Sequence, residues 1–149
     1  QLDVVGAKNI AARSIDKESG YGLGKGWITF QADGRAEESL GYPSVVLEER
    51  AEWFASGHVG RAIPRRLADS GWIWASMASS IVQRQIASLA CGSVVDALYV
   101  EDLEAVIIPP RELVDAEAAS EAWDDLSASV KKQAEAINLV ESALRELGL

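Results

Sequence analysis

The last third of the chain carries a heptad pattern that predicts one long helix. Its apolar positions alternate in spacing between three and four residues, which aligns them along one side of a helix. The seam comprises Trp123, Leu126, Val130, Gln133, Ile137, Val140, Leu144 and Leu147. Ala116 and Ala119 extend it backwards, so the helix would be on the order of 50 Å long.

A helix of that length cannot bury its whole seam on the domain that precedes it. We therefore expect the seam to pack antiparallel against a second helix, with Gln133, its one polar member, fixing the register. The alternative is a terminal helix that lies partly on its own domain. The pattern divides the chain into a globular domain over residues 1–110 and a coiled-coil helix over residues 111–149.

The globular part shows both strand and helix patterns, which predicts an α/β (α+β) fold. Short β-type runs occupy residues 2–7, 26–31 and 43–49, and the apolar run at 103–110 predicts a buried strand that ends at two prolines. Residues 72–90 predict one amphipathic helix. Its stripe is formed by Ala75, Ala78, Val82, Ile86 and Leu89.

The net charge of −9 argues against nucleic acid when it is taken alone, because phosphates favour clustered Lys and Arg. The charge is unevenly distributed, however. Residues 53–95 hold four arginines against one aspartate, whereas residues 111–149 hold four basic and nine acidic residues. The middle of the chain is thus mildly basic, and its surface can meet a different partner from the ends.

The sequence offers little for catalysis. The single histidine, His58, cannot form a histidine-rich metal site, and Cys91 follows an apolar run, which favours a buried, inert thiol. The glycine run Gly20–Gly26 lacks the Lys-Ser/Thr of a phosphate loop and is typical of a flexible turn. We expect no metal, no cofactor and no enzymatic activity. A small hydrolase using His58 is the least favoured interpretation.

The stretch 55–66, "ASGHVGRAIPRR", is the strongest candidate for binding. Two glycines flank His58 and permit a tight turn, and Arg61, Arg65 and Arg66 follow it. Arginine suits phosphate and can form a bidentate pair with guanine, and glutamine can do the same with adenine. An ordinary surface turn is equally compatible with the residues alone.

The run Ser79–Pro110, "SSIVQRQIASLACGSVVDALYVEDLEAVIIPP", resembles the target recognition domains of DNA specificity subunits in Type I restriction–modification systems. The similar features are the "QRQI" run, a "GS" turn, a "DL" pair and an "IPP" strand end, in that order. Upstream, "SGHVGRAIP" resembles the stretch before the family's central helix. The resemblance covers roughly residues 53–147.

The resemblance implies that the chain selects a sequence on double-stranded DNA, while adenine methyltransferase subunits modify it and a restriction subunit cuts. Such subunits space two recognition domains with coiled-coil helices. This chain has one of each, so we expect a second spacer helix, from a homodimer partner or from the rest of a longer subunit. The start at Gln1 likewise suggests a processed or excised piece.

The candidate DNA-binding residues lie in the 55–66 stretch, in the central helix and in the turn after it. They are Ser56, Gly57, His58, Gly60, Arg61, Arg65, Arg66, Gln83, Arg84, Gly92 and Ser93. The competing hypothesis is a protein–protein adaptor whose function is the coiled coil. No apolar stretch is long enough to span a membrane, and no secretory start is present, so we expect a cytoplasmic protein.

Overall fold

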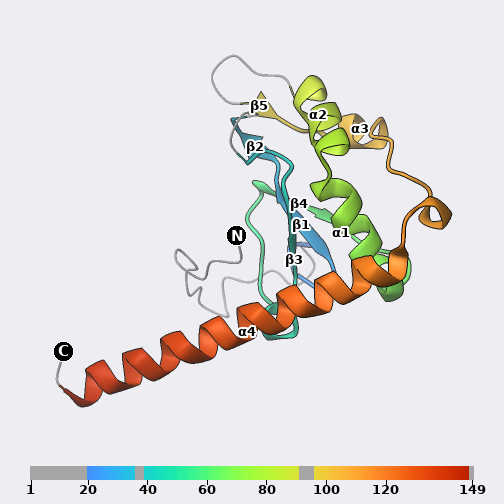
Figure 1. The fold of residues 1–149 in the computed structure, drawn as a ribbon. Coiled ribbons are helices and arrows are strands. Elements are labelled where there is room, and N and C mark those ends of the chain that lie inside the picture. Colours follow the sequence, from blue (N-terminus) through green and yellow to red (C-terminus); the bar gives the residue numbers. More distant parts are fainter. Residues whose placement is uncertain (1–19, 36–38, 91–95, 148–149) are drawn as a thin grey trace.

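The computed structural model describes residues 20–35, 39–90 and 96–147, and it confirms the mixed α+β fold (Figure 1). Small antiparallel sheets and short helices form the domain, and a long helix runs along one side of it. The elements in chain order are β1 (Ile28–Gln31), β2 (Asp33–Gly34), β3 (Pro43–Val45), η2 (Glu48–Arg50), β4 (Val59–Ala62), η3 (Leu67–Asp69), α1 (Ser70–Ala78), α2 (Ser80–Leu89), β5 (Asp96–Ala97), α3 (Val100–Glu104), η4 (Arg111–Leu113) and α4 (Ala116–Glu146).

The main sheet has β1 at its centre, with β3 and β4 antiparallel on either side. Thr29 is in register with Ser44 on one side and with Arg61 on the other. A second, two-stranded sheet pairs β2 with β5. The strands predicted at 26–31 and 43–49 are confirmed as β1 and β3, although Glu48–Arg50 forms a 3-10 turn. The run at 2–7 lies outside the described residues.

One face of the main sheet packs on the helices. Ile28 and Phe30 are buried, and they form a cluster with Met77 of α1. A second cluster joins Leu40 and Leu98 to α2, through the side chains of Val82 and Ile86. Because side chains alternate along a strand, Thr29 and Gln31 point to the opposite, outer face of the sheet.

The predicted single helix over 72–90 is wrong, because Ser79 divides it into α1 and α2. Ser79 has an extended backbone, and its hydroxyl both donates to the Ser76 carbonyl and accepts from the Val82 amide. It is therefore the N-cap of α2, a position that serine favours strongly. Of the predicted apolar stripe, only Val82 and Ile86 are fully buried.

The strand predicted at 103–110 is also wrong. Its first residues complete α3, and 106–110 form no regular element. The amide of Gln85 holds this segment, since it donates to the Ile107 carbonyl and accepts from the Ile107 N–H, both at 2.9 Å. The Trp72 indole donates to the Pro109 carbonyl at 3.1 Å. The backbone of this segment thus makes hydrogen bonds to the side chains of Gln85 and Trp72, where the predicted strand would have bonded to a neighbouring strand.

The predicted terminal helix is confirmed as α4, which has 31 residues and a length of about 46 Å. Asp115 caps it by accepting from the Ala118 amide at 2.9 Å. Its first turns pack on α1, while its C-terminal half extends away from the domain (Figure 1). Among the described residues, no helix has both the length and the apolar character of a membrane span.

Helix α4 approaches α1 closely at Gly71. A Cβ atom at position 71 would lie 2.8 Å from the Ala119 carbonyl oxygen and 2.9 Å from the Ser120 Cα. Beside this contact, the rings of Trp74 and Trp123 meet edge to face with their centroids 6.4 Å apart. The absence of a side chain at Gly71 therefore lets the first half of α4 become part of the domain core.

We predict that Gly71→Ala lowers the free energy of unfolding by about 1–3 kcal/mol, because backbone atoms of α4 must move to admit the methyl group. Urea unfolding followed by tryptophan fluorescence measures this. Gly57→Ala is the matched control, since a Cβ there meets nothing within 4 Å. Equal stability of the two variants would show that α4 does not need the close contact.

Candidate nucleic-acid interface

The stretch 55–66 does not form the single loop that the sequence suggested. Its centre is strand β4, which separates a turn at 56–58 from an irregular segment at 63–66. Four strand residues span about 13 Å, so His58 lies at one end of β4 while Arg65 and Arg66 lie beyond the other. The candidates of this stretch therefore occupy two places.

The first place is the turn that carries His58. Ser56 and Gly57 are exposed, and the Ser56 carbonyl accepts from the Val59 amide at 3.1 Å to close the turn. The His58 side chain is 78% exposed, and its Nδ1 pairs with the Asp33 carboxylate. The turn is thus held against β2 and presents the rest of the imidazole ring outward.

Within β4, Gly60 and Arg61 have distinct roles. A Cβ at Gly60 would lie 2.1 Å from the Phe30 ring, so this glycine makes room for the core. Arg61 is on the outer face, where its guanidinium donates to the Gly20 carbonyl and stands over the Tyr21 ring, 5.3 Å from its centroid. Within the described part of the chain, the bond to Gly20 uses one of the five guanidinium donors.

The second place, just before α1, holds Arg65 and Arg66, which differ in their contacts. Arg65 is exposed, and within the described residues it forms no ion pair. Arg66 binds the buried carboxylate of Asp69 through two hydrogen bonds of 2.9 and 3.1 Å, and this contact raises the pKa of Arg66. Arg66 therefore has a structural partner already, and Arg65 is the freer cation.

The two candidates on the central helix, Gln83 and Arg84, also differ in their contacts. Arg84 is exposed on α2. The Gln83 amide, by contrast, donates to the carbonyls of Met77 at 2.8 Å and Gly41 at 3.2 Å, so this candidate for DNA binding already has two backbone partners. Gly92 and Ser93 lie outside the described residues.

Sequence reasoning missed the outer face of the main sheet. A row of polar side chains crosses it, formed by Ser44, Thr29 and Arg61 in register. Next to this row, a groove of about 540 Å³ is lined by Thr29, Phe30, Gln31, Ser39, Tyr42, Ser44, His58 and Val59. The period-2 alternation of "ITFQ" was the signal that could have found it.

The chemistry of this outer groove suits a polar ligand. Hydroxyl, amide, phenol and imidazole groups line it, and none of the lining residues is acidic. The carboxylate of Asp33 lies beside the groove, where it pairs with His58. Donors and acceptors arranged on a rigid sheet are what the edges of nucleic-acid bases and phosphate oxygens require.

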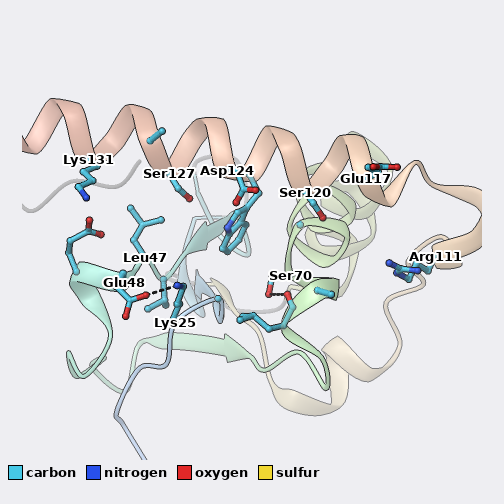
Figure 2. Close-up of a pocket in the computed structure, with 18 residues that line it drawn as sticks. Lys25, Leu47, Glu48, Ser70, Arg111, Glu117, Ser120, Asp124, Ser127 and Lys131 are labelled. Carbon is cyan, nitrogen blue, oxygen red and sulfur yellow. Dashed lines mark hydrogen bonds and ion pairs between the residues drawn. The ribbon is translucent and has the colours of Figure 1, made fainter.

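A larger groove of about 880 Å³ lies beneath α4 (Figure 2). Asp124, Ser127 and Lys131 line its helix side, and the opposite side includes Leu47 and an ion pair of 2.5 Å between Lys25 and Glu48. The hydrogen bond and charge of Glu48 raise the pKa of Lys25. Acidic and basic side chains are mixed here, and none of the predicted DNA-binding residues lines this groove.

The seam of α4 divides into two parts. Trp123 belongs to the domain core, and Leu126 and Val130 are half-buried. Beyond them the seam is open, because Gln133 is exposed and Ile137, Val140, Leu144 and Leu147 are between 42% and 75% exposed. The alternative of a helix lying partly on its own domain therefore holds for the first half, and only the distal half is available to a partner.

Comparison with known proteins adds no assignment, since neither a protein-family model nor a curated protein matches this chain. Among the described residues, no group of three or more His, Cys, Asp or Glu side chains is placed to hold a metal ion. The features that bear on function are the outer groove, the open seam and the motifs of the sequence.

We predict that Gln83→Ala lowers the free energy of unfolding by about 1–3 kcal/mol, since two carbonyls lose their donor in a half-buried position. The adjacent Arg84→Ala, on an exposed side chain, should change stability by less than about 0.5 kcal/mol. Thermal and urea unfolding of both variants make the test. An unchanged stability of Gln83→Ala would show that the two carbonyl contacts do not support the fold.

We further predict that Ile137→Glu leaves the domain folded and abolishes association through the distal seam, because a buried charge in such a seam is strongly unfavourable. Glu135→Ala, which places the change just outside the seam, is the control. Light scattering and the near-ultraviolet circular dichroism of the tryptophans report the two effects separately. Loss of the tryptophan signal in Ile137→Glu would mean that the distal half supports the domain.

Proposed function

We propose that this chain is a DNA sequence-recognition module of a Type I restriction–modification complex, acting in the cytoplasm and without chemistry of its own. The observation that carries the proposal is the outer face of the main sheet, where polar side chains converge on a groove and Arg61 supplies positive charge. The motifs in Ser56–Pro64 and Ser79–Pro110 support the same assignment.

In this proposal the domain and α4 have separate tasks. The sheet face and the His58 turn meet the double helix, with phosphates positioning the module and base edges specifying the site. The open half of the α4 seam binds a second spacer helix, from an identical chain or from the rest of a longer subunit. Methyltransferase subunits then methylate adenine, and a restriction subunit cuts.

The net charge of −9 is compatible with this function because nine of the 23 acidic residues lie in residues 111–149, whereas Arg61 lies in the main sheet. The described part of α4 carries Glu117, Glu121, Asp124, Asp125, Glu135, Glu141 and Glu146. Long-range repulsion is screened beyond about 8–10 Å at ordinary salt concentrations. Partner subunits that also contact the DNA would share the remaining electrostatic task.

The second candidate function is a protein–protein adaptor, and the exposed distal seam is the observation that favours it. Four apolar side chains on an extended helix have no partner helix among the described residues. An adaptor would use this seam in the same way but would bind duplex DNA neither alone nor in the complex. DNA binding by the complex of this chain with methyltransferase subunits therefore separates the two functions.

We predict that Arg61→Ala weakens duplex binding by this complex and reduces the slope of log affinity against log salt by about one, as expected for one lost phosphate contact. Arg145→Ala, in an i,i+4 pair with Glu141 near the end of α4, is the matched control and should change neither quantity. Fluorescence anisotropy over a salt series measures both. Binding that is identical in wild type and Arg61→Ala would remove the sheet face from the interface, and no binding at all would favour the adaptor.

A further inference from the structure

Gln31 is an exposed side chain whose amide is nevertheless held at both ends. It is the last residue of β1 and lines the outer groove. The Ser39 hydroxyl donates to its Oε1 at 2.6 Å, and its Nε2 donates to the Asp33 carbonyl at 2.8 Å. Exposed glutamines ordinarily keep their rotational freedom, so the two contacts set this one apart.

The backbone around Gln31 is shaped to receive the amide. A Cβ at Gly34 would lie 2.6 Å from Nε2 and 3.2 Å from Cδ of Gln31, so a glycine is needed for the side chain to lie there. Gly34 is fixed in turn by its pairing with Asp96 of β5. The main-chain oxygen of Gln31 also accepts from the Gly41 amide at 2.9 Å. The contacts to Ser39, Asp33 and Gly34 thus set the orientation of the Gln31 amide, and the bond from Gly41 fixes the backbone that carries it.

The held amide still has binding capacity. A glutamine amide offers two N–H donors and two acceptor positions on its oxygen, and the contacts to Ser39 and Asp33 use one of each. One donor and one acceptor remain. In the major groove, adenine presents the complement, an acceptor at N7 beside a donor at N6, whereas guanine presents two acceptors there.

We infer that Gln31 reads an adenine in the major groove and that Ser39 is its positioning residue. The inference rests on the proposed function, because it names the base that the outer groove selects. A pre-oriented amide loses less freedom on binding than a mobile one, and the discrimination against other bases is correspondingly large. The bordering His58 and Tyr42 are placed to contact the same segment of DNA.

The test uses the complex of this chain with its methyltransferase subunits. The adenine methylation pattern of a host carrying the complete operon gives the recognised site, and competition binding with duplexes changed one base at a time gives the preference at each position. For Gln31→Ala, we expect the preference for adenine at one position to fall by about 5- to 150-fold, with the other positions unchanged. For Gln31→Glu, the same position should shift towards cytosine, whose N4 donor suits a carboxylate.

Two further variants test whether Ser39 acts by positioning the Gln31 amide. Ser39→Ala should reduce the preference at the same position by a smaller factor. Ser88→Ala, whose hydroxyl donates only to the Gln85 carbonyl within α2, should leave every position unchanged. A uniform loss of affinity in Gln31→Ala, or an unchanged site, would overturn the inference while the proposed function stands. A wild-type complex without sequence preference would overturn the proposed function itself.

Discussion

The buried carboxylate of Asp69 connects the parts of this structure. It lies at the start of α1, where it pairs with Arg66 from the β4–α1 connection and, at 3.1 Å, with Arg111 from the segment that leads to α4. A buried charge that loses a partner is strongly destabilising, so both arginines are constrained to this point. The start of α1 and the approach of α4 are thereby fixed together, which brings Gly71 against Ala119 and Trp74 against Trp123.

The two glutamines of the "QRQI" motif show why a motif can be informative about a fold without being the site. Gln83 joins α2 to the carbonyl of Gly41, and Gln85 joins it to the backbone of Ile107. Both contacts stabilise segments outside the regular elements, namely the turn at Gly41 and the run around Ile107. The glutamine for which we propose a ligand is Gln31, in a stretch that no motif marked. Sequence alone could not distinguish the three, because their partners are defined by the tertiary fold.

What could be predicted from the sequence was the locally encoded structure. The α4 helix follows from a heptad pattern over many turns, and β1 follows from alternation in "ITFQ". The break at Ser79 could not be found from periodicity, because one hydroxyl that caps a helix leaves the apolar spacing intact. The apolar run at 103–110 was misassigned because a short run fits a buried strand and an irregular core segment equally well. For the candidate site, composition identified His58 and Arg61 but not the register that places Arg61 beside Thr29 and Ser44.

The arrangement is compatible with the proposed function, in which DNA recognition and assembly use different faces of the molecule. The inner face of the main sheet is occupied by α1, and the first half of α4 packs on α1. The polar groove lies on the other face, and the open seam begins only where α4 leaves the domain. A partner helix on Ile137 and Leu144 therefore has no need to cover Gln31 or His58. Because α4 is anchored through Trp123 at a rigid core, the seam also sets the distance and orientation at which a second module would stand. That geometry, fixed by the helix, would determine the spacing between two half-sites on the DNA.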